Sequence, residues 1–256
     1  MNDIFFSKEF TFNSFSFRAC HHSDNTHGIE WHYFAVLKKG TVRIVTSEHE
    51  EYFFQEGDVF YLPRGCRYRS HWRGVSESNN CVEWDSLGFK TFPDVDNKSY
   101  KLQKLSVSEK QAEYLDEICA DMAISPKNVG YLYLFLAEAV KSMVATPRDS
   151  KSLIVERARK YIDEHNELHV SELAKHCNVS ESGLYKFFRD NLNTTPIGFK
   201  NQIKVNRAVN MLKYTSASVE EISTELGFSN AAYFRKIFKS HTGKTPLKIR
   251  KEAKHI

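Results

Sequence analysis

One segment of this chain occurs twice, and the repeat restricts the fold more than any other feature of the sequence. The stretch VSELAKHCNVSESGLYKFFRDNLNTTP, residues 170–196, corresponds to VEEISTELGFSNAAYFRKIFKSHTGKTP, residues 219–246. Apolar positions match at an offset of 49 before the expected turn and 50 after it, as for Phe188 with Phe238. Each copy predicts a short helix, a tight turn and a second helix, which is the sequence form of a helix-turn-helix.

The second helix of each copy, expected over residues 181–192 and 230–242, has two different faces. Phe234 and Phe238 lie together at helical spacing, whereas Lys236 lies on the opposite side. The apolar face can pack on the short helix, and the basic face can enter a major groove, where Lys and Arg reach guanine edges and phosphates. The residues expected to contact DNA are Ser182, Tyr185, Lys186 and Arg189 in the first copy and Asn230, Ala232, Arg235, Lys236 and Lys239 in the second.

A long helix over residues 196–213 is expected to join the two copies. Thr195 and Pro196 are typical of a helix start, and Ser218 with Glu221 forms the pattern of a capping box before the second copy. The long helix would hold the basic faces apart, so that they read successive major-groove faces about 34 Å apart. Two amphipathic hairpins that only pack together are the alternative, and the recurrence of the basic face argues against it.

The charge of the chain is distributed unevenly. Residues 151–256 contain 19 Lys and Arg against 11 Asp and Glu, a formal charge of +8, whereas residues 1–150 carry −4. A basic half favours an anionic polymer such as nucleic acid as its partner. A basic solvated surface has the same composition, so charge alone leaves both interpretations open.

The first part of the chain, up to about residue 100, is typical of a β-structure. YFAVL, TVRIVT, EYFF and VFYLP are short β-branched or aromatic runs with turn residues between them, which predicts a small antiparallel sandwich or barrel. Helices are expected over residues 106–122 and 126–145, and the polar segment 145–152 is typical of a linker.

The expected fold class is therefore α+β with two domains. The first domain, residues 1–148, would hold the barrel and the two helices. The second, residues 149–256, would be all-α with two helix-turn-helix modules.

The stretch ELGFSNAAYFRKIFKSHTGKTPLKIR resembles the DNA-binding domain of the AraC/XylS family of bacterial transcription regulators, and the resemblance covers about residues 153–251. GDVFYLPRG, residues 57–65, is similar to the second conserved segment of cupin barrels. Together they imply a cupin-like barrel followed by a double helix-turn-helix. The positions that carry the family pattern are Gly227, Phe228, Tyr233, Phe234, Phe238, Lys239, Gly243, Pro246 and Arg250.

The first module departs from the family pattern more than the second. Asn193 stands in place of the usual C-terminal glycine, although asparagine tolerates the same left-handed conformation. Gly183 lies inside the recognition helix, where glycine costs about 1 kcal/mol relative to alanine. His169 stands where Ser or Thr would cap the short helix better. In the second module, Gly227 supplies the positive φ that suits a tight turn.

The resemblance implies a sequence-specific DNA-binding regulator, an activator like most relatives, that binds double-stranded promoter DNA and works with RNA polymerase. It also implies a homodimer formed through the helices of the first domain; packing of these helices on the barrel is the alternative. The residues expected at the dimer interface are Leu132, Phe135, Leu136, Ala139 and Met143.

A small-molecule effector in the barrel is also implied by the resemblance. The candidate residues are each polar or aromatic beside an apolar strand, and an ordinary core or surface position is the alternative for any one of them. They are Arg18, His32, Tyr68, His71 and Trp84.

A cupin-type enzyme with an accessory DNA-binding domain is the alternative function. Metal cupins carry a histidine shortly after the segment that GDVFYLPRG resembles, but Tyr68 stands there, and the first metal-binding segment is not found. His21 and His22 are adjacent, so a strand would direct them to opposite faces. We therefore expect no catalytic residues, no metal and no other cofactor.

The cysteines and the N-terminus are consistent with a cytoplasmic protein. The five cysteines are odd in number and widely spaced, without a C-x-x-C pair, which fits a reducing compartment. The first residues lack the pattern of a signal peptide, and no apolar run approaches the ~20 residues of a membrane span, so no membrane partner is expected.

Overall fold

The computed structural model of the chain describes residues 9–26, 28–75, 81–90, 98–147, 150–165 and 167–254. The chain divides into two units, Met1–Pro147 and Arg148–Ile256, and each is described by itself. The boundary expected between residues 148 and 149 lies outside the described residues.

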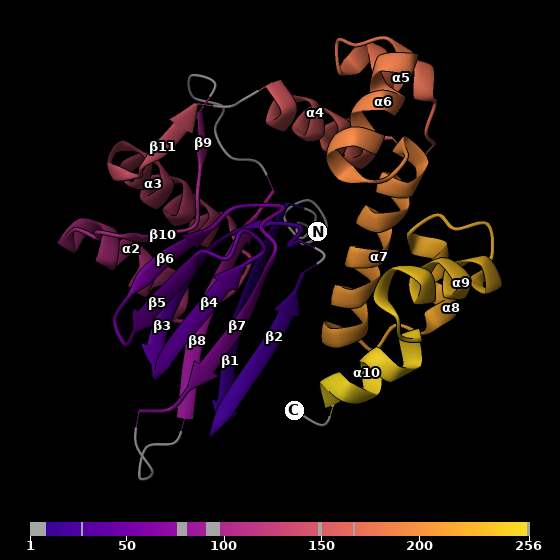
Figure 1. Ribbon diagram of the computed structural model, residues 1–256. Helices are drawn as coiled ribbons and strands as arrows, with labels where there is room; N and C mark the ends of the chain where they lie inside the picture. The colour runs from indigo at the N-terminus through magenta and orange to yellow at the C-terminus, as the bar shows by residue number, and fades with distance from the viewer. Residues whose placement is uncertain are drawn as a thin grey trace. The chain divides into compact units, whose positions relative to one another are not determined.

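Antiparallel strands build the first unit (Figure 1). The larger sheet has the strand order β1-β8-β3-β6-β10, the smaller sheet has the order β2-β7-β4-β5, and β9 pairs with β11. The strands are β1 (Phe10–Arg18), β2 (Cys20–Asn25), β3 (His32–Lys39), β4 (Thr41–Thr46), β5 (Glu51–Gln55), β6 (Val59–Leu62), β7 (Tyr68–Arg73), β8 (Cys81–Phe89), β9 (Lys98–Tyr100), β10 (Gln103–Leu105) and β11 (Ala145–Pro147). The helices of this unit are α2 (Glu109–Cys119) and α3 (Pro126–Ser142).

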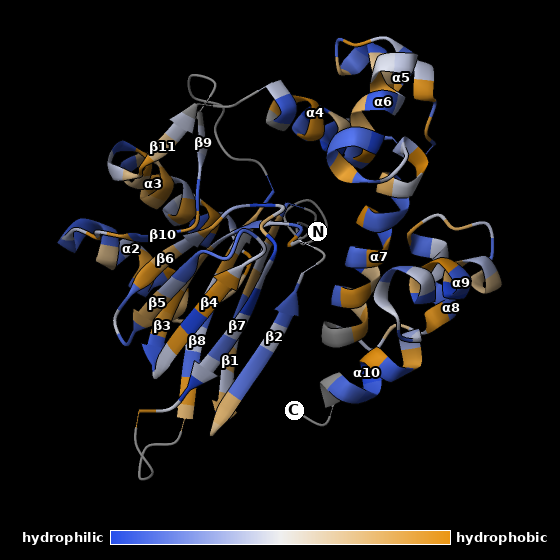
Figure 2. Cartoon of the chain, viewed as in Figure 1, coloured by the Kyte–Doolittle hydropathy of each residue, from blue (hydrophilic) through white to orange (hydrophobic). Residues whose placement is uncertain are grey.

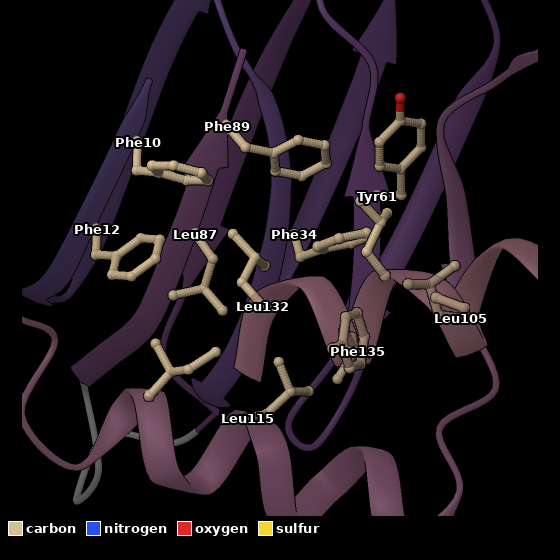
Figure 3. Packing of buried hydrophobic residues seen from close by; sticks show 14 of the residues in the cluster. Phe10, Phe12, Phe34, Tyr61, Leu87, Phe89, Leu105, Leu115, Leu132 and Phe135 are labelled. Atoms are coloured by element: carbon tan, nitrogen blue, oxygen red, sulfur yellow. The ribbon is translucent and has the colours of Figure 1, made fainter. Parts of the chain in front are cut away.

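The larger sheet is buried on both faces because successive side chains of a strand point to opposite sides. On β3, Phe34 faces the helices, whereas Ala35 faces the smaller sheet. Figure 3 shows the helix side, where Phe34 and Phe89 of the sheet lie over Phe135 of α3. The space between the sheets is filled by stacked aromatic rings, among them Trp72 and Trp84 with ring centroids 3.9 Å apart.

Helix α3 directs its apolar stripe into the helix-side core. The residues expected at a dimer interface, Leu132, Phe135, Leu136, Ala139 and Met143, are all buried there. The helix side of the larger sheet carries a row of aromatic rings, and the apolar face of α3 shields these rings from water. The outer side of α3 instead exposes half of the side chain of Leu134, and Tyr133, also about half exposed, packs its ring edge-on against Phe10 of β1.

The second unit consists of helices in the described residues. They are α4 (Ser150–Glu164), α5 (Val170–His176), α6 (Glu181–Leu192), α7 (Pro196–Tyr214), α8 (Val219–Glu225), α9 (Ala231–Thr242) and α10 (Pro246–Lys254). Hydrophobic and hydrophilic residues alternate along these helices, as expected for amphipathic packing (Figure 2). The structure thus has a β-sheet first unit and a helical second unit, in agreement with the α+β class expected from the sequence.

Helix α7 belongs to both helix-turn-helix modules. Phe199 and Ile203, in its first half, pack with α5 and α6. Val205, Ala208 and Leu212, in its second half, pack with α8 and α9. A single continuous helix therefore contributes to two separate cores.

The two modules turn in the same way. Gly227 follows α8 with φ +64°, and Asn178 follows α5 with φ +57°. After the second helices, Asn193 and Gly243 end α6 and α9 with φ +49° and +69°. Asn193 thus adopts the left-handed conformation expected from the sequence, since Asn is among the few side chains that tolerate it.

The helix starts also follow the sequence pattern, with one weak cap. Ser218 and Glu221 form a reciprocal capping box before α8. His169, at the start of α5, makes no capping hydrogen bond with its side chain. A Cβ at Gly183 would lie 3.0 Å from the hydroxyl of Ser180, the residue that caps α6. The glycine in α6 therefore leaves room for its own helix cap.

Some elements were not expected from the sequence. Helix α10 lies beyond the repeat and packs against α7, and Arg250 of α10 donates a hydrogen bond to the carbonyl of Ala217. Strands β1 and β8, which pair along nine residues, were also missed. No described helix combines the length and the apolar character of a membrane-spanning segment.

Replacing Gly227 with alanine tests the turn. A Cβ there would meet only the amine of Lys204 at 3.5 Å, an ordinary contact, so the strain comes from the positive φ. We expect Gly227→Ala to lower the free energy of unfolding of the second unit by about 1–2 kcal/mol in urea titrations. Gly130→Ala in α3 is the control, because its Cβ meets nothing within 4 Å; it should stabilise by about 0.5–1 kcal/mol. Equal stability of Gly227→Ala and the unchanged chain would contradict the strain argument.

Candidate nucleic-acid interface

The orientation of α6 and α9 is set by buried aromatic side chains. Phe188 of α6 and Phe234 and Phe238 of α9 are completely buried. Each helix also has a side-chain cap: the hydroxyl of Ser180 accepts from the amide of Gly183, and the side chain of Asn230 accepts from the amide of Tyr233 at 2.7 Å. Burial on one side and a fixed start leave the opposite side of each helix facing solvent.

The residues expected to contact DNA lie on this exposed side. Ser182, Tyr185, Lys186, Arg189, Asn230, Ala232, Arg235, Lys236 and Lys239 are all exposed. Asn230 has a structural role as well, because its side-chain oxygen caps α9. Tyr233 was not expected at this surface, although it is 41% exposed and its position three residues before Lys236 indicates the same side of the helix.

The exposed cations differ in their partners. Arg235 forms an ion pair with Glu220 of α8, and the Nε of Arg189 lies 3.2 Å from the carboxylate of Asp190. Within the described part of the chain, Lys186, Lys236 and Lys239 form no ion pair. The three lysines are available to phosphates directly, whereas each arginine would first exchange a carboxylate for the new partner. Both arginine pairs are solvent-exposed and therefore weak.

Lys204 of α7 contacts the turn between α8 and α9. Its amine donates a hydrogen bond of 2.8 Å to the carbonyl of Gly227 and lies 5.0 Å from the ring centre of Phe228. Burial lowers the pKa of Lys204 to about 8, and the positive charges of Lys200 and Arg207 act in the same direction. The backbone of the turn is therefore held by an amine whose pKa is about 8.

The five residues expected to bind an effector do not line one cavity. Tyr68 and Trp84 are buried between the sheets. His71 lies on the opposite, outer face of β7. His32 joins the helix side, with its Nδ1 2.7 Å from the hydroxyl of Tyr61, and Arg18 is exposed at the end of β1. Successive side chains of a strand point to opposite faces of its sheet. The sequence of one strand does not show which face packs against the helices and which against the other sheet.

The described residues contain no group of three His, Cys, Asp or Glu side chains that could hold a metal ion. Burial also raises the pKa of the Cys66 and Cys119 thiols to about 12, which keeps both in the unreactive thiol form.

Comparison with known proteins identifies the family. Residues 173–252 match the family model of a helix-turn-helix domain. The Msm operon regulatory protein of Streptococcus mutans serotype c is 31% identical over 216 residues, which cover 77% of this chain and 76% of that protein. The chain belongs to the AraC/XylS family of bacterial transcription regulators. Another AraC/XylS relative, the lactose operon transcription activator of Staphylococcus xylosus, is 25% identical and covers 81% of this chain and 82% of its own length.

A solved member of the same fold extends over both units. ToxT from Vibrio cholerae, in a crystal structure with a bound unsaturated fatty acid, has a TM-score of 0.62 at 15% identity and covers 94% of each chain. At this identity the likeness concerns the fold. The first unit is the β-sheet domain and the second the helix-turn-helix domain of an AraC/XylS regulator.

The unusual amine of Lys204 predicts a specific pH dependence of stability. Its pKa falls from the ordinary 10.5 in the unfolded chain to about 8 in the folded one, so between these values the unfolded chain binds more protons. Stability from this group therefore rises with pH from about 8 to 10.5. We expect the difference in unfolding free energy between the unchanged chain and Lys204→Met to move in favour of the unchanged chain across this window. A difference that stays constant with pH would contradict the lowered pKa.

Proposed function

We propose that this chain activates transcription by reading promoter DNA with α6 and α9 in successive major grooves. The observation that carries the proposal is the matched pair of helices, each buried by aromatic residues on one side and basic on the other. A net charge of +8 on residues 151–256 would draw the second unit to DNA and give binding a strong salt dependence.

Some exposed residues of α6 and α9 would bind phosphates and position the protein on DNA, and others would recognise the bases. Lys186, Lys236 and Lys239 have the reach for phosphates or guanine edges. Ala232 offers a methyl group of the kind that contacts thymine, and Tyr185 offers a ring and a hydroxyl. Sequence specificity would come from the base-edge contacts, since phosphate contacts are alike for every sequence.

Activation implies contact with RNA polymerase, and the name of the staphylococcal relative supports an activator. We further propose that the first unit binds a small-molecule effector, as ToxT binds an unsaturated fatty acid. The proposed ligand class comes from ToxT, because the space between the sheets of this chain is filled by aromatic side chains. A rise in the melting temperature of the first unit with an unsaturated fatty acid would support the effector; its absence at saturating ligand would reject this class.

We further propose that catalysis is not the main activity of the protein. We also propose a cytoplasmic location, because bacterial promoter DNA lies in the cytoplasm. The relatives that support it are named as regulators of transcription, and none of the residues singled out forms a nucleophile with an adjacent base.

A homodimer is proposed through the outer side of α3. The stripe expected from the sequence is occupied by the larger sheet, but Leu134 remains half exposed on the other side, and Tyr133 is about half exposed beside its contact with Phe10. Two neighbouring large apolar side chains on a helix surface suit a helix-to-helix contact between two copies.

Selection of binding sites from random duplex DNA by the full-length chain tests the function. We expect a motif with two half-sites about one helical turn apart, because α7 joins the two helices. Lys236→Ala should weaken binding to that motif by about 1–3 kcal/mol if Lys236 reads a base, and Lys110→Ala on α2 should have no effect as a charge-matched control. If no motif is recovered and binding is lost at moderate salt, the helices contact only phosphates. That result would reject sequence-specific regulation.

Substitution of Leu134 tests the dimer. Leu134→Glu should shift the chain from dimer to monomer in sedimentation velocity while leaving the melting temperature nearly unchanged, since the side chain is half exposed. Phe135→Ala, one residue further and completely buried, should instead cost about 3–5 kcal/mol of stability without a direct effect on assembly. A Leu134→Glu protein that remains dimeric would reject α3 as the interface.

A further inference from the structure

Two histidines meet on the outer face of the smaller sheet. His22 of β2 and His71 of β7 are direct partners in the antiparallel register. Their Nδ1 atoms are 2.6 Å apart, with ring centroids at 4.8 Å and an interplanar angle of 74°. Both side chains point away from the core between the sheets, because Tyr68 and Trp72 on alternating positions of β7 point into it.

The contact brings together two nitrogens that are both good metal ligands. With a proton between them, one imidazole donates and the other accepts. Without that proton, both lone pairs point to the same region of space. Two bonds of about 2.0–2.1 Å from a tetrahedral zinc ion would hold the nitrogens about 3.3–3.4 Å apart. Small rotations of two rings at the surface can supply the remaining separation of somewhat under 1 Å.

We propose that His22 and His71 bind one divalent ion of the late first transition series, of which Zn²⁺, Cu²⁺ and Ni²⁺ are the members that favour imidazole. Since no third His, Cys, Asp or Glu of the described residues is placed to join them, water completes the coordination. The site lies outside the core of the barrel and apart from α6 and α9, and it does not depend on the proposed function.

The charged residues around the pair leave its nitrogens available. Three arginines share this face, and two of them are paired: Arg43 makes two hydrogen bonds to Glu51, and Arg69 lies 3.6 Å from Asp24. The third is Arg73. The two paired arginines thus leave the nitrogens of His22 and His71 facing each other.

A metal here would join two strands that are distant in sequence. β2 and β7 are held by backbone pairing along Cys20–Asn25 and Tyr68–Arg73. An ion bound only by the folded sheet stabilises it, and the gain grows with the ratio of the free ion concentration to the dissociation constant. The pair thus couples the free concentration of a transition metal to the stability of the first unit.

Titration of tag-free full-length protein with Zn²⁺, in competition with a chromophoric chelator at neutral pH, tests the site. We expect one equivalent to bind, His22→Gln and His71→Gln each to weaken binding by about tenfold or more, and His49→Asn to bind like the unchanged chain. His49 is the control because it is an exposed histidine of the same unit, and Asn tolerates its positive φ of 63°.

A second measurement separates the site from unspecific binding. Zinc should shift the Nδ1 resonances of His22 and His71 in imidazole nitrogen NMR and raise the melting temperature of the unchanged chain more than that of either Gln variant. Both histidines lie at the surface, so the variants are expected to fold. Equal zinc affinity in all variants, or no binding at micromolar free zinc, would overturn the proposal.

Discussion

The burial of phenylalanine rings on one side of α6 and α9 is the interaction on which the second unit depends. Phe188, Phe234 and Phe238 have no exposed surface, and each helix carries cations on the side turned away from them. Burial of a ring of this size contributes about 1.5–3 kcal/mol relative to exposure. The same interaction that stabilises a module therefore also fixes the direction in which its basic side chains point.

The sequence predicted the helical unit well because its signals are local. Apolar spacing, the capping box at Ser218 and the left-handed positions at Gly227 and Asn193 each depend on residues within one or two turns. Helix α10 was missed although its start at Thr245 and Pro246 repeats the Thr195-Pro196 start of α7. The cap at Asn230 was not foreseen either, since a side chain that suits DNA also suits a helix start.

The first unit was predicted less completely because a sheet is decided by pairing between distant segments. Alternation in β1 places Phe10 and Phe12 on the helix side but Phe15 and Phe17 on the other, so both faces of one strand carry rings. A strand with rings on both faces has no clear polar side in its sequence. The stripe on α3 turned inward because it covers the helix side of the larger sheet, and alternation along β7 placed Tyr68 and His71 on opposite faces of the smaller sheet.

The length of helix α7 determines the distance between α6 and α9. Its 19 residues span about 28 Å at 1.5 Å per residue, and its two halves belong to different cores. Insertion of a single residue next to Lys204 would rotate one module by about 100° around the helix axis relative to the other. It would also shift that module by about 1.5 Å along the axis. Few insertions or deletions in α7 can therefore survive selection.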